Sequence, residues 1–311
     1  MAKYIYLLCL ALLVTTSTFL PAQTRTDKKL QRKIESLVQG FNGEVGIYVK
    51  NVRTGKIASY HADTIFPTAS MIKIPILIGV MDKIQKGELN YLQELIYTDS
   101  LLYAGVDILG SYKNGEKTTI SRVVMLMLTM SDNTASLWLQ SLAGTGTRIN
   151  AILDSLGFKT TRVNSRTPGR ENNRTEFGWG QTSPREMAGL MELIYNRTLF
   201  QPALSEKMLR LLGRNYWDET AISQIPPYVF VASKNGAVNQ SRSETLLVMA
   251  PHGPYIFSII TKNLKDQRWN SDNEAWVLIR KLSRLLWNHY EPSSNWQPTT
   301  PVEGNNIVDK D

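Results

Sequence analysis

The chain has 311 residues, 42% of them hydrophobic, and a formal net charge of +8. That length and apolar content can supply a core for one domain or for two closely packed ones. The Lys and Arg residues are scattered and do not alternate with aromatic residues, which argues against a nucleic-acid partner. A single cysteine excludes a disulfide framework, and three dispersed histidines indicate neither a zinc site nor, without a G-x-S-x-G elbow, a Ser-His-Asp triad. We therefore expect no metal and no cofactor.

The first 23 residues have the pattern of a secretory signal peptide. Lys3 gives a positive start, residues 5–20 are mostly apolar, and Ala22 is a small residue near a plausible cleavage point. Polar residues dilute the end of this run, which makes it short for a membrane span; an uncleaved anchor is the alternative. Cleavage leaves a periplasmic or secreted protein without a thiol, because the only cysteine, Cys9, lies inside the signal. We expect the mature protein to be a monomer with no stable membrane span.

Hydrophobic periodicity and turn residues predict the secondary structure from residue 26 onward. Turn-forming residues at 51–55 join the first two strands as a hairpin. Ser183 is a helix N-cap, with Pro184 at the first helical position and Glu186 three residues after the serine. In chain order, the predicted elements are a helix over 26–41, strands over 45–50 and 57–60, helices over 71–84, 121–130, 147–156 and 183–195, strands over 229–233, 245–249 and 255–261, and a helix over 272–289.

This order of elements predicts a mixed fold. Hairpins rather than crossover helices join the strands, so the sheet is antiparallel and the fold class is α/β of the α+β type. The helix over 71–84 is apolar on most faces, which predicts burial in the middle of the protein. Residues 292–311 contain Pro, Ser, Thr, Asn and terminal charges and are predicted to form a disordered tail.

Three short motifs carry the chemistry of the chain. Ser70 and Lys73 form an S-x-x-K motif, which places a hydroxyl and an amine on the same face of a helix within one turn. A serine hydroxyl is a weak nucleophile until a neighbouring group takes its proton. Ser131-Asp132-Asn133 and Lys234-Asn235-Gly236 follow, with 61 and 103 residues between the first members of successive motifs. Each motif alone is a weak signal, but three of them in this order and at these spacings are not a chance occurrence.

The set resembles the serine β-lactamase and penicillin-binding-protein superfamily, and most closely the class A β-lactamases. The resemblance covers roughly residues 44–289. It implies a catalytic domain over 24–291 in which a five-stranded α/β part comes from approximately 26–62 and 210–291. An all-α part comes from approximately 63–209, and the active site would lie in the groove between the two parts.

The resemblance assigns the catalytic roles mainly to the first two motifs. Ser70 is the nucleophile, and its backbone N–H and that of Ala237 would donate to the oxyanion. Lys73 is the base or proton relay, because burial and a second cation lower the pKa of a lysine. Ser131 would pass the proton to the leaving nitrogen, and Asn133 would hold the lysine and the substrate's amide side chain. The alternative for Ser70 is a serine that only caps the helix, and the alternative for Lys73 is a lysine that reaches solvent at the helix edge.

The third motif is expected to bind the substrate. Lys234 would lower the pKa of the catalytic lysine and attract a substrate carboxylate, and Gly236 would let the strand backbone approach the ligand closely. Asn235 replaces the family's usual Ser or Thr, and its amide can still donate a hydrogen bond. Arg242 is a candidate second anchor for the carboxylate; a pair with Glu244 on the neighbouring strand is the alternative.

A second departure from the family concerns deacylation. Class A enzymes have an E-x-x-L-N motif whose glutamate activates the water that frees the acyl-enzyme. When this chain is matched to the class A motif through residues 161–163, Thr167 occupies the position of the glutamate. We name Glu171 as the candidate replacement and Glu176 as a second one; the alternative is that both are solvated or paired with neighbouring arginines. Without a base in this place, acylation proceeds while deacylation stalls.

The sequence therefore predicts an exported serine hydrolase that opens β-lactam rings through an acyl-enzyme on Ser70, with slow deacylation. The expected ligand is a small β-lactam or a related amide or peptide. One alternative is a D,D-peptidase or esterase of the same fold. Another is a non-catalytic sensor of β-lactams or cell-wall fragments.

Overall fold

The computed structural model describes residues 25–103 and 107–304, so the predicted signal peptide lies outside the described part. Within that part, no helix has the length and apolar character needed to cross a membrane. The helices are α1 (Lys28–Leu37), α2 (Lys73–Gln85), α3 (Ile120–Met125), α4 (Asn133–Leu142), α5 (Thr145–Ser155), α6 (Glu171–Phe177), α7 (Pro184–Tyr195), α8 (Pro202–Leu212) and α9 (Glu274–Tyr290). Short helical turns are η1 (Ala69–Ile72), η2 (Asp99–Leu101), η3 (Leu109–Ser111), η4 (Leu126–Met130) and η5 (Ile222–Gln224).

A five-stranded antiparallel sheet forms one half of the molecule, in the order β2-β1-β10-β9-β8. Its strands are β1 (Glu44–Asn51), β2 (Ile57–Tyr60), β8 (Val231–Val238), β9 (Ser241–Val248) and β10 (Tyr255–Lys262). The predicted mixed fold with an antiparallel sheet is confirmed. A two-residue hairpin loop joins β8 to β9, which leaves β8 as an edge strand beside the helical part.

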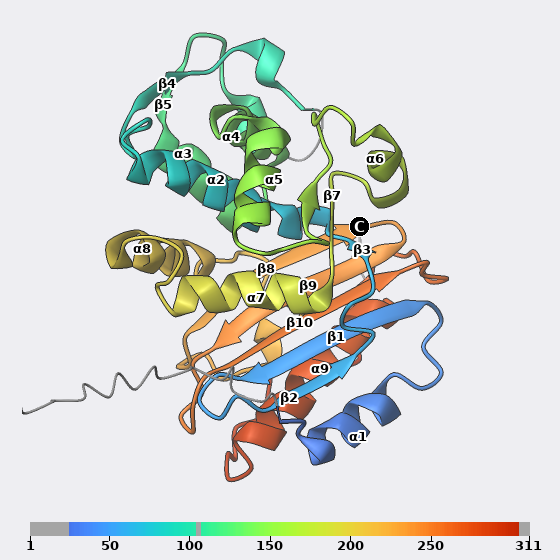
Figure 1. Cartoon of the computed structure of the whole chain (residues 1–311). Helices are drawn as coiled ribbons and strands as arrows, with labels where there is room; N and C mark the ends of the chain where they lie inside the picture. Colours follow the sequence, from blue (N-terminus) through green and yellow to red (C-terminus); the bar gives the residue numbers. More distant parts are fainter. Residues whose placement is uncertain (1–24, 104–106, 305–311) are drawn as a thin grey trace, which may run out of the picture.

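Helices cover both faces of this sheet (Figure 1). On one face, α1 and α9 pack over apolar side chains such as Ile47, Leu246 and Phe257. On the other face, α7 lies against β1, β9 and β10, and α8 contacts the edge strand β8. The strand residues that point to this second face, including Leu247 and Ile260, join the same apolar cluster as α2. Burial on both faces stabilises the sheet and holds its edge strand in place.

The helical part is built around α2, whose residues from Lys73 to Asp82 are all buried. Helices α4, α5 and α8 pack around it. Pro75 lies within the first turn of α2, where backbone N–H groups have no intrahelical acceptor, so it does not interrupt the helix. Two small sheets complete this half, from β3 (Phe66–Pro67), β6 (Arg162–Val163) and β7 (Gly180–Thr182), and from β4 (Glu94–Ile96) and β5 (Lys117–Thr119).

The segment after α9 differs from the predicted disordered tail. Arg284 and Arg280 on α9 donate to the backbone carbonyls of Trp296 and Val302, and Gln224 donates to that of Thr300. Buried guanidinium and amide donors therefore hold the chain against α9 as far as residue 304. This corrects the prediction over residues 292–304, and residues 305–311 lie outside the described part.

Candidate active site

Ser70 lies in the tight η1 turn that opens α2, facing the edge strand β8. The turn is anchored at its start, where the Thr68 N–H donates to the Gly180 carbonyl at 2.9 Å. Ala69 has a φ of +44°, which is unfavourable for a residue with a side chain and marks local strain. The sequence around the nucleophile thus forms a strained turn at the junction of the two parts.

Lys73 connects the nucleophile to the second motif. Its Nζ lies 3.0 Å from Ser70 Oγ, 3.0 Å from Ser131 Oγ and 2.9 Å from Asn133 Oδ1. It also donates to the Ser131 carbonyl at 2.5 Å. An amine between two hydroxyls is placed to take a proton from one and deliver it to the other. The structure therefore brings together four side chains of the first two motifs, those of Ser70, Lys73, Ser131 and Asn133.

Burial governs the protonation of this amine. Lys73 is fully buried, and the loss of hydration lowers its pKa from 10.5 to about 7, although Asp107 and Asp132 partly oppose the shift. The pKa of Lys234 is also well below its usual value, first because of burial and then because of the charge of Lys73. Of the two causes that the sequence analysis named, burial is the one that lowers the pKa of Lys73. A substantial fraction of Lys73 is neutral near pH 7, as a base requires.

The second motif sits where a helix widens and ends. Residues 126–130 form a π-helical turn, and Ser131 follows with a φ of +61° in the left-handed region. This turn aims Ser131 back toward Lys73. Asp132 is structural, because its carboxylate caps α4 through the Ala135 N–H and also accepts the Leu109 N–H.

Asp107 supports the same loop, and sequence reasoning did not identify it. Its two carboxylate oxygens accept the backbone N–H groups of Asn133 and Thr134 at 3.0 and 2.9 Å. The Thr134 hydroxyl also donates to it at 3.0 Å. No motif marks this residue, because it reaches the loop from a separate segment. It fixes the orientation of Asn133. Of the two carboxylates that oppose the pKa shift of Lys73, it has the larger effect.

The edge strand β8 closes the opposite side of the site. A Cβ on Gly236 would lie 2.7 Å from the Thr68 carbonyl oxygen and 2.8 Å from the Ser70 nitrogen, so only glycine permits this approach. Lys234 is fully buried, and its Nζ donates to the carbonyl and the side-chain oxygen of Asn235 at 3.0 and 3.1 Å. The amide of Asn235 therefore acts here as an acceptor for the lysine. Ala237, the expected second oxyanion donor, lines the cavity with Ser70.

Arg242 does not reach the site. Its guanidinium donates to the carbonyls of Val238, Ser241 and Arg268, and it stacks over the rings of Trp269 and Trp276, with 4.4 and 4.6 Å to their centroids. Arg242 is an even number of residues from Leu246 on β9, whose side chain packs in the cluster with α9, so it lies on the α9 face of the sheet. The structure thus corrects the expected carboxylate anchor, and it also gives no pair between this arginine and Glu244.

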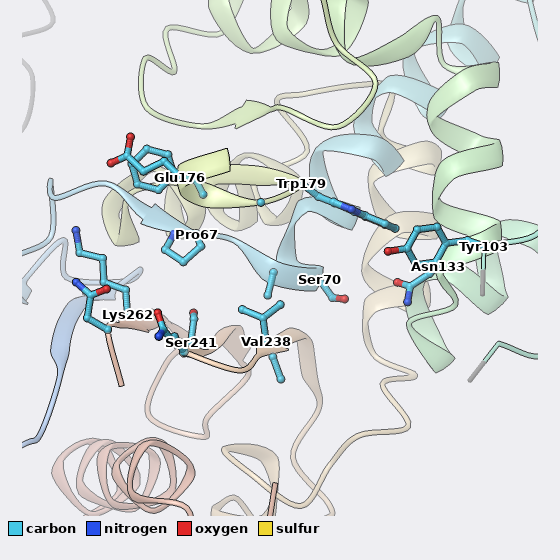
Figure 2. Close-up of a pocket in the computed structure, with 15 residues that line it drawn as sticks. Pro67, Ser70, Tyr103, Asn133, Glu176, Trp179, Val238, Ser241 and Lys262 are labelled. Atoms are coloured by element: carbon cyan, nitrogen blue, oxygen red, sulfur yellow. The ribbon is translucent and has the colours of Figure 1, made fainter. Parts of the chain in front are cut away.

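Two adjoining cavities of about 510 and 640 Å³ open above Ser70, and both are lined by Ser70, Asn133 and Ala237. The first extends past Tyr103 and Trp179, whose rings meet edge to face at 5.0 Å (Figure 2). The second extends along the outer side of β8. Its wall includes Trp217, Thr220, Asn235, Trp276 and Arg280. Within the described residues, no cluster of His, Cys, Asp or Glu side chains could hold a metal ion.

Neither candidate deacylation base is aimed at Ser70. Glu171 is exposed at the start of α6 and accepts the Gly169 N–H at 3.1 Å. Glu176 lines the first cavity, but its carboxylate lies at the far end and points away from Ser70 (Figure 2). Thr167, at the position matched to the family glutamate, turns its hydroxyl to the Ser165 carbonyl. The structure therefore does not bring Glu171 into the site.

Comparisons with known proteins agree with this geometry. The model of the Beta-lactamase enzyme family matches residues 29–290. The chain belongs to this family. The β-lactamase VEB-1 of Pseudomonas aeruginosa is 24% identical over 304 residues, which cover 93% of this chain and 99% of that protein. A β-lactamase of Streptomyces fradiae is 25% identical over 293 residues, or 89% of this chain and 92% of that protein.

Solved structures show the same fold. The structure of PBP-A superposes with a TM-score of 0.77 at 24% identity, covering 86% of this chain and 98% of that one. A β-lactamase from Sphaerobacter thermophilus DSM 20745 gives a TM-score of 0.74 at 20% identity, with 83% and 96% covered. These neighbours share the fold of this chain. The family match and the curated relatives confirm the predicted resemblance to the serine β-lactamase and penicillin-binding-protein superfamily.

Proposed function

We propose that the protein is an exported serine hydrolase that opens β-lactam rings through an acyl-enzyme on Ser70 and releases the product slowly. The contacts of Lys73 with Ser70, Ser131 and Asn133 carry this proposal. Neutral Lys73 takes the proton of Ser70 as its oxygen attacks the ring carbonyl. The backbone N–H groups of Ser70 and Ala237 stabilise the oxyanion. Ser131 then protonates the departing ring nitrogen and receives in return the proton that Lys73 took from Ser70.

Slow release follows from the orientation of the acidic residues near the site. Among the described residues of 161–177, no carboxylate points toward Ser70, since Glu171 is exposed and Glu176 is directed away. General-base assistance is typically worth about 10²–10⁴-fold, so we expect deacylation to be slower by a factor of this size than it would be with such a base. One solved structure of the same fold is a mutant of PBP-A in an acyl-enzyme complex with penicillin G. It is 25% identical to this chain and superposes with a TM-score of 0.77.

Time-resolved nitrocefin hydrolysis tests this function. We expect a burst of one product per protein molecule followed by a slow steady phase, with no burst in Ser70→Ala. Glu171→Gln and Glu176→Gln should leave the steady phase unchanged. Steady turnover without a burst, abolished by either glutamine variant, would identify a relocated base and contradict slow deacylation.

The alternative is a D,D-peptidase or esterase of the same fold, and the lack of an aimed carboxylate at the deacylation position favours it. Such an enzyme would also be acylated by β-lactams. It would in addition release product from a D-alanyl-D-alanine peptide or a small ester through Ser70. Hydrolysis of these substrates faster than of nitrocefin would favour this alternative.

A further inference from the structure

The segment of residues 215–221 spans one end of the groove and touches both halves of the protein. Toward the helical part, the Tyr216 N–H donates to the Thr129 carbonyl, and Trp217 Nε1 donates to the Met130 carbonyl, both at 3.1 Å. Met130 immediately precedes the serine of the second motif. The position of this segment is therefore coupled to the loop that carries the proton-transferring hydroxyl.

Glu244 holds the other side of this segment. It is fully buried on β9, where it lies opposite Asn235 in the register with β8. Its Oε2 accepts the Thr220 hydroxyl at 2.6 Å and the Ala221 N–H at 3.0 Å. Among the described residues, no donor reaches its other oxygen, Oε1, although that atom is buried. A buried carboxyl with this donor set is unusual, since acidic side chains are rarely fully buried without a charge partner.

We propose that Glu244 is a positioning residue whose ionised carboxylate holds the 215–221 segment on the sheet and thereby sets the position of Ser131 relative to Ser70. This inference rests on the proposed function for its effect on acylation. Its structural part, the control of the segment by one carboxyl, stands independently.

The charge state of Glu244 changes in the physiological range. Burial raises the pKa of Glu244 from 4.5 to about 7. The hydrogen bonds from Thr220 and Ala221 and the charge of Lys234 on β8 oppose this rise, whereas the charge of Glu219 on the segment adds to it. Arg280 on α9 lines the second cavity together with Glu219 and Thr220, and it donates to the Ser271 and Val302 carbonyls. Hydrogen bonds to an ionised acceptor are roughly twice as strong as those to a neutral one. The segment is therefore held more tightly above pH 7 than below it.

Fluorine NMR of protein labelled with 5-fluorotryptophan tests the structural part without any substrate. Trp217→Phe assigns the Trp217 resonance by its loss. We expect this resonance to shift with a midpoint near pH 7 in the wild type and to stay constant between pH 5.5 and 8.5 in Glu244→Gln. Glu219→Gln, a change in an exposed carboxyl of the same segment, and Lys73→Met should both retain the titration.

Thr220→Val gives a second measurement if the glutamine variant does not fold. It removes a donor to the carboxylate, so the midpoint should move to higher pH. A wild-type resonance that does not titrate, a titration that survives Glu244→Gln, its loss in Glu219→Gln or Lys73→Met, or an unchanged midpoint in Thr220→Val would each overturn the proposal.

Acylation by penicillin G tests the functional part. At pH 8 we expect the acylation rate constant of Glu244→Gln to be about fivefold below the wild type, because a neutral acceptor holds the segment less tightly. At pH 5.5, where the wild-type carboxyl is also neutral, the two rate constants should agree. Equal rate constants at both pH values would overturn the coupling to Ser131. Absence of acylation in every variant would instead reject the proposed function, while the NMR titration would still decide the role of Glu244.

Discussion

Replacing Lys73 with methionine should make the protein less dependent on pH for its stability. In the folded protein the pKa of Lys73 is about 7, against 10.5 for an exposed lysine, a difference of about 3.5 units. At 1.36 kcal/mol per unit this corresponds to a destabilisation of roughly 5 kcal/mol by the protonated amine relative to the neutral one. Because Lys73 is fully buried, solvent does not screen the charge of its amine.

The sign follows from proton binding. Between pH 7 and 10.5 the unfolded chain keeps the Lys73 proton and the folded protein loses it, so the free energy of unfolding rises with pH. Above 10.5 the destabilisation is absent, and below 7 it is fully present. From pH 7 to pH 9 the wild type should therefore gain about 2 kcal/mol over Lys73→Met. Urea unfolding at several pH values measures both proteins.

A matched control removes the neighbouring buried amine. The stability of Lys234→Met is compared with that of the double variant that carries both Lys73→Met and Lys234→Met. This comparison excludes the titration of Lys234, whose own pKa depends on the charge of Lys73. The gain with pH should persist in this background. Parallel stability curves for the proteins with and without Lys73 would show that the amine titrates at its ordinary pKa. In that case Lys73 would not be neutral near pH 7, and the proposed base would be wrong.

Three further predictions follow from single contacts. Gly236→Ala should slow acylation by penicillin about 100-fold in stopped-flow measurements, because its Cβ would lie 2.8 Å from the Ser70 nitrogen; an unchanged rate would refute the close approach. Arg242→Met should lower the free energy of unfolding by about 3 kcal/mol, because three carbonyls lose a buried charged donor, while KM stays within about twofold of the wild type; a large rise in KM would restore the anchor role. Thr167→Glu should not accelerate deacylation and should destabilise the protein by about 2 kcal/mol, because Thr167 packs against Gly146; faster nitrocefin turnover would contradict this.

Much of the site was predictable because the motifs are local and chemically constrained. Helical spacing places Ser70 and Lys73 on one face, and the close approach of β8 requires Gly236. The strands and the antiparallel sheet followed from alternating apolar residues and a hairpin turn. The π-helical turn before Ser131 was not predictable, because its residues read as an ordinary apolar helix.

The errors concern residues whose role depends on distant contacts. Arg242 was expected in the groove, but the two-residue hairpin loop sets a register that turns it to the α9 face. Asp107 supports the Asn133 loop from a separate segment, and no local pattern marks it. The tail after α9 is polar in composition, yet buried donors such as Arg280 hold its backbone. Sequence composition reports local preference, whereas these three outcomes are decided by tertiary hydrogen bonds.

The identity of the nucleophile and the slow release of product can be measured together. Intact-mass spectrometry of the protein mixed with penicillin G, sampled from seconds to hours, follows the acyl-enzyme directly. We predict an adduct of one intact penicillin per protein molecule that forms within seconds, persists after free penicillin is removed, and maps by peptide digestion to Ser70. Absence of an adduct at every time, with or without hydrolysis of the penicillin, would contradict a long-lived acyl-enzyme at this serine.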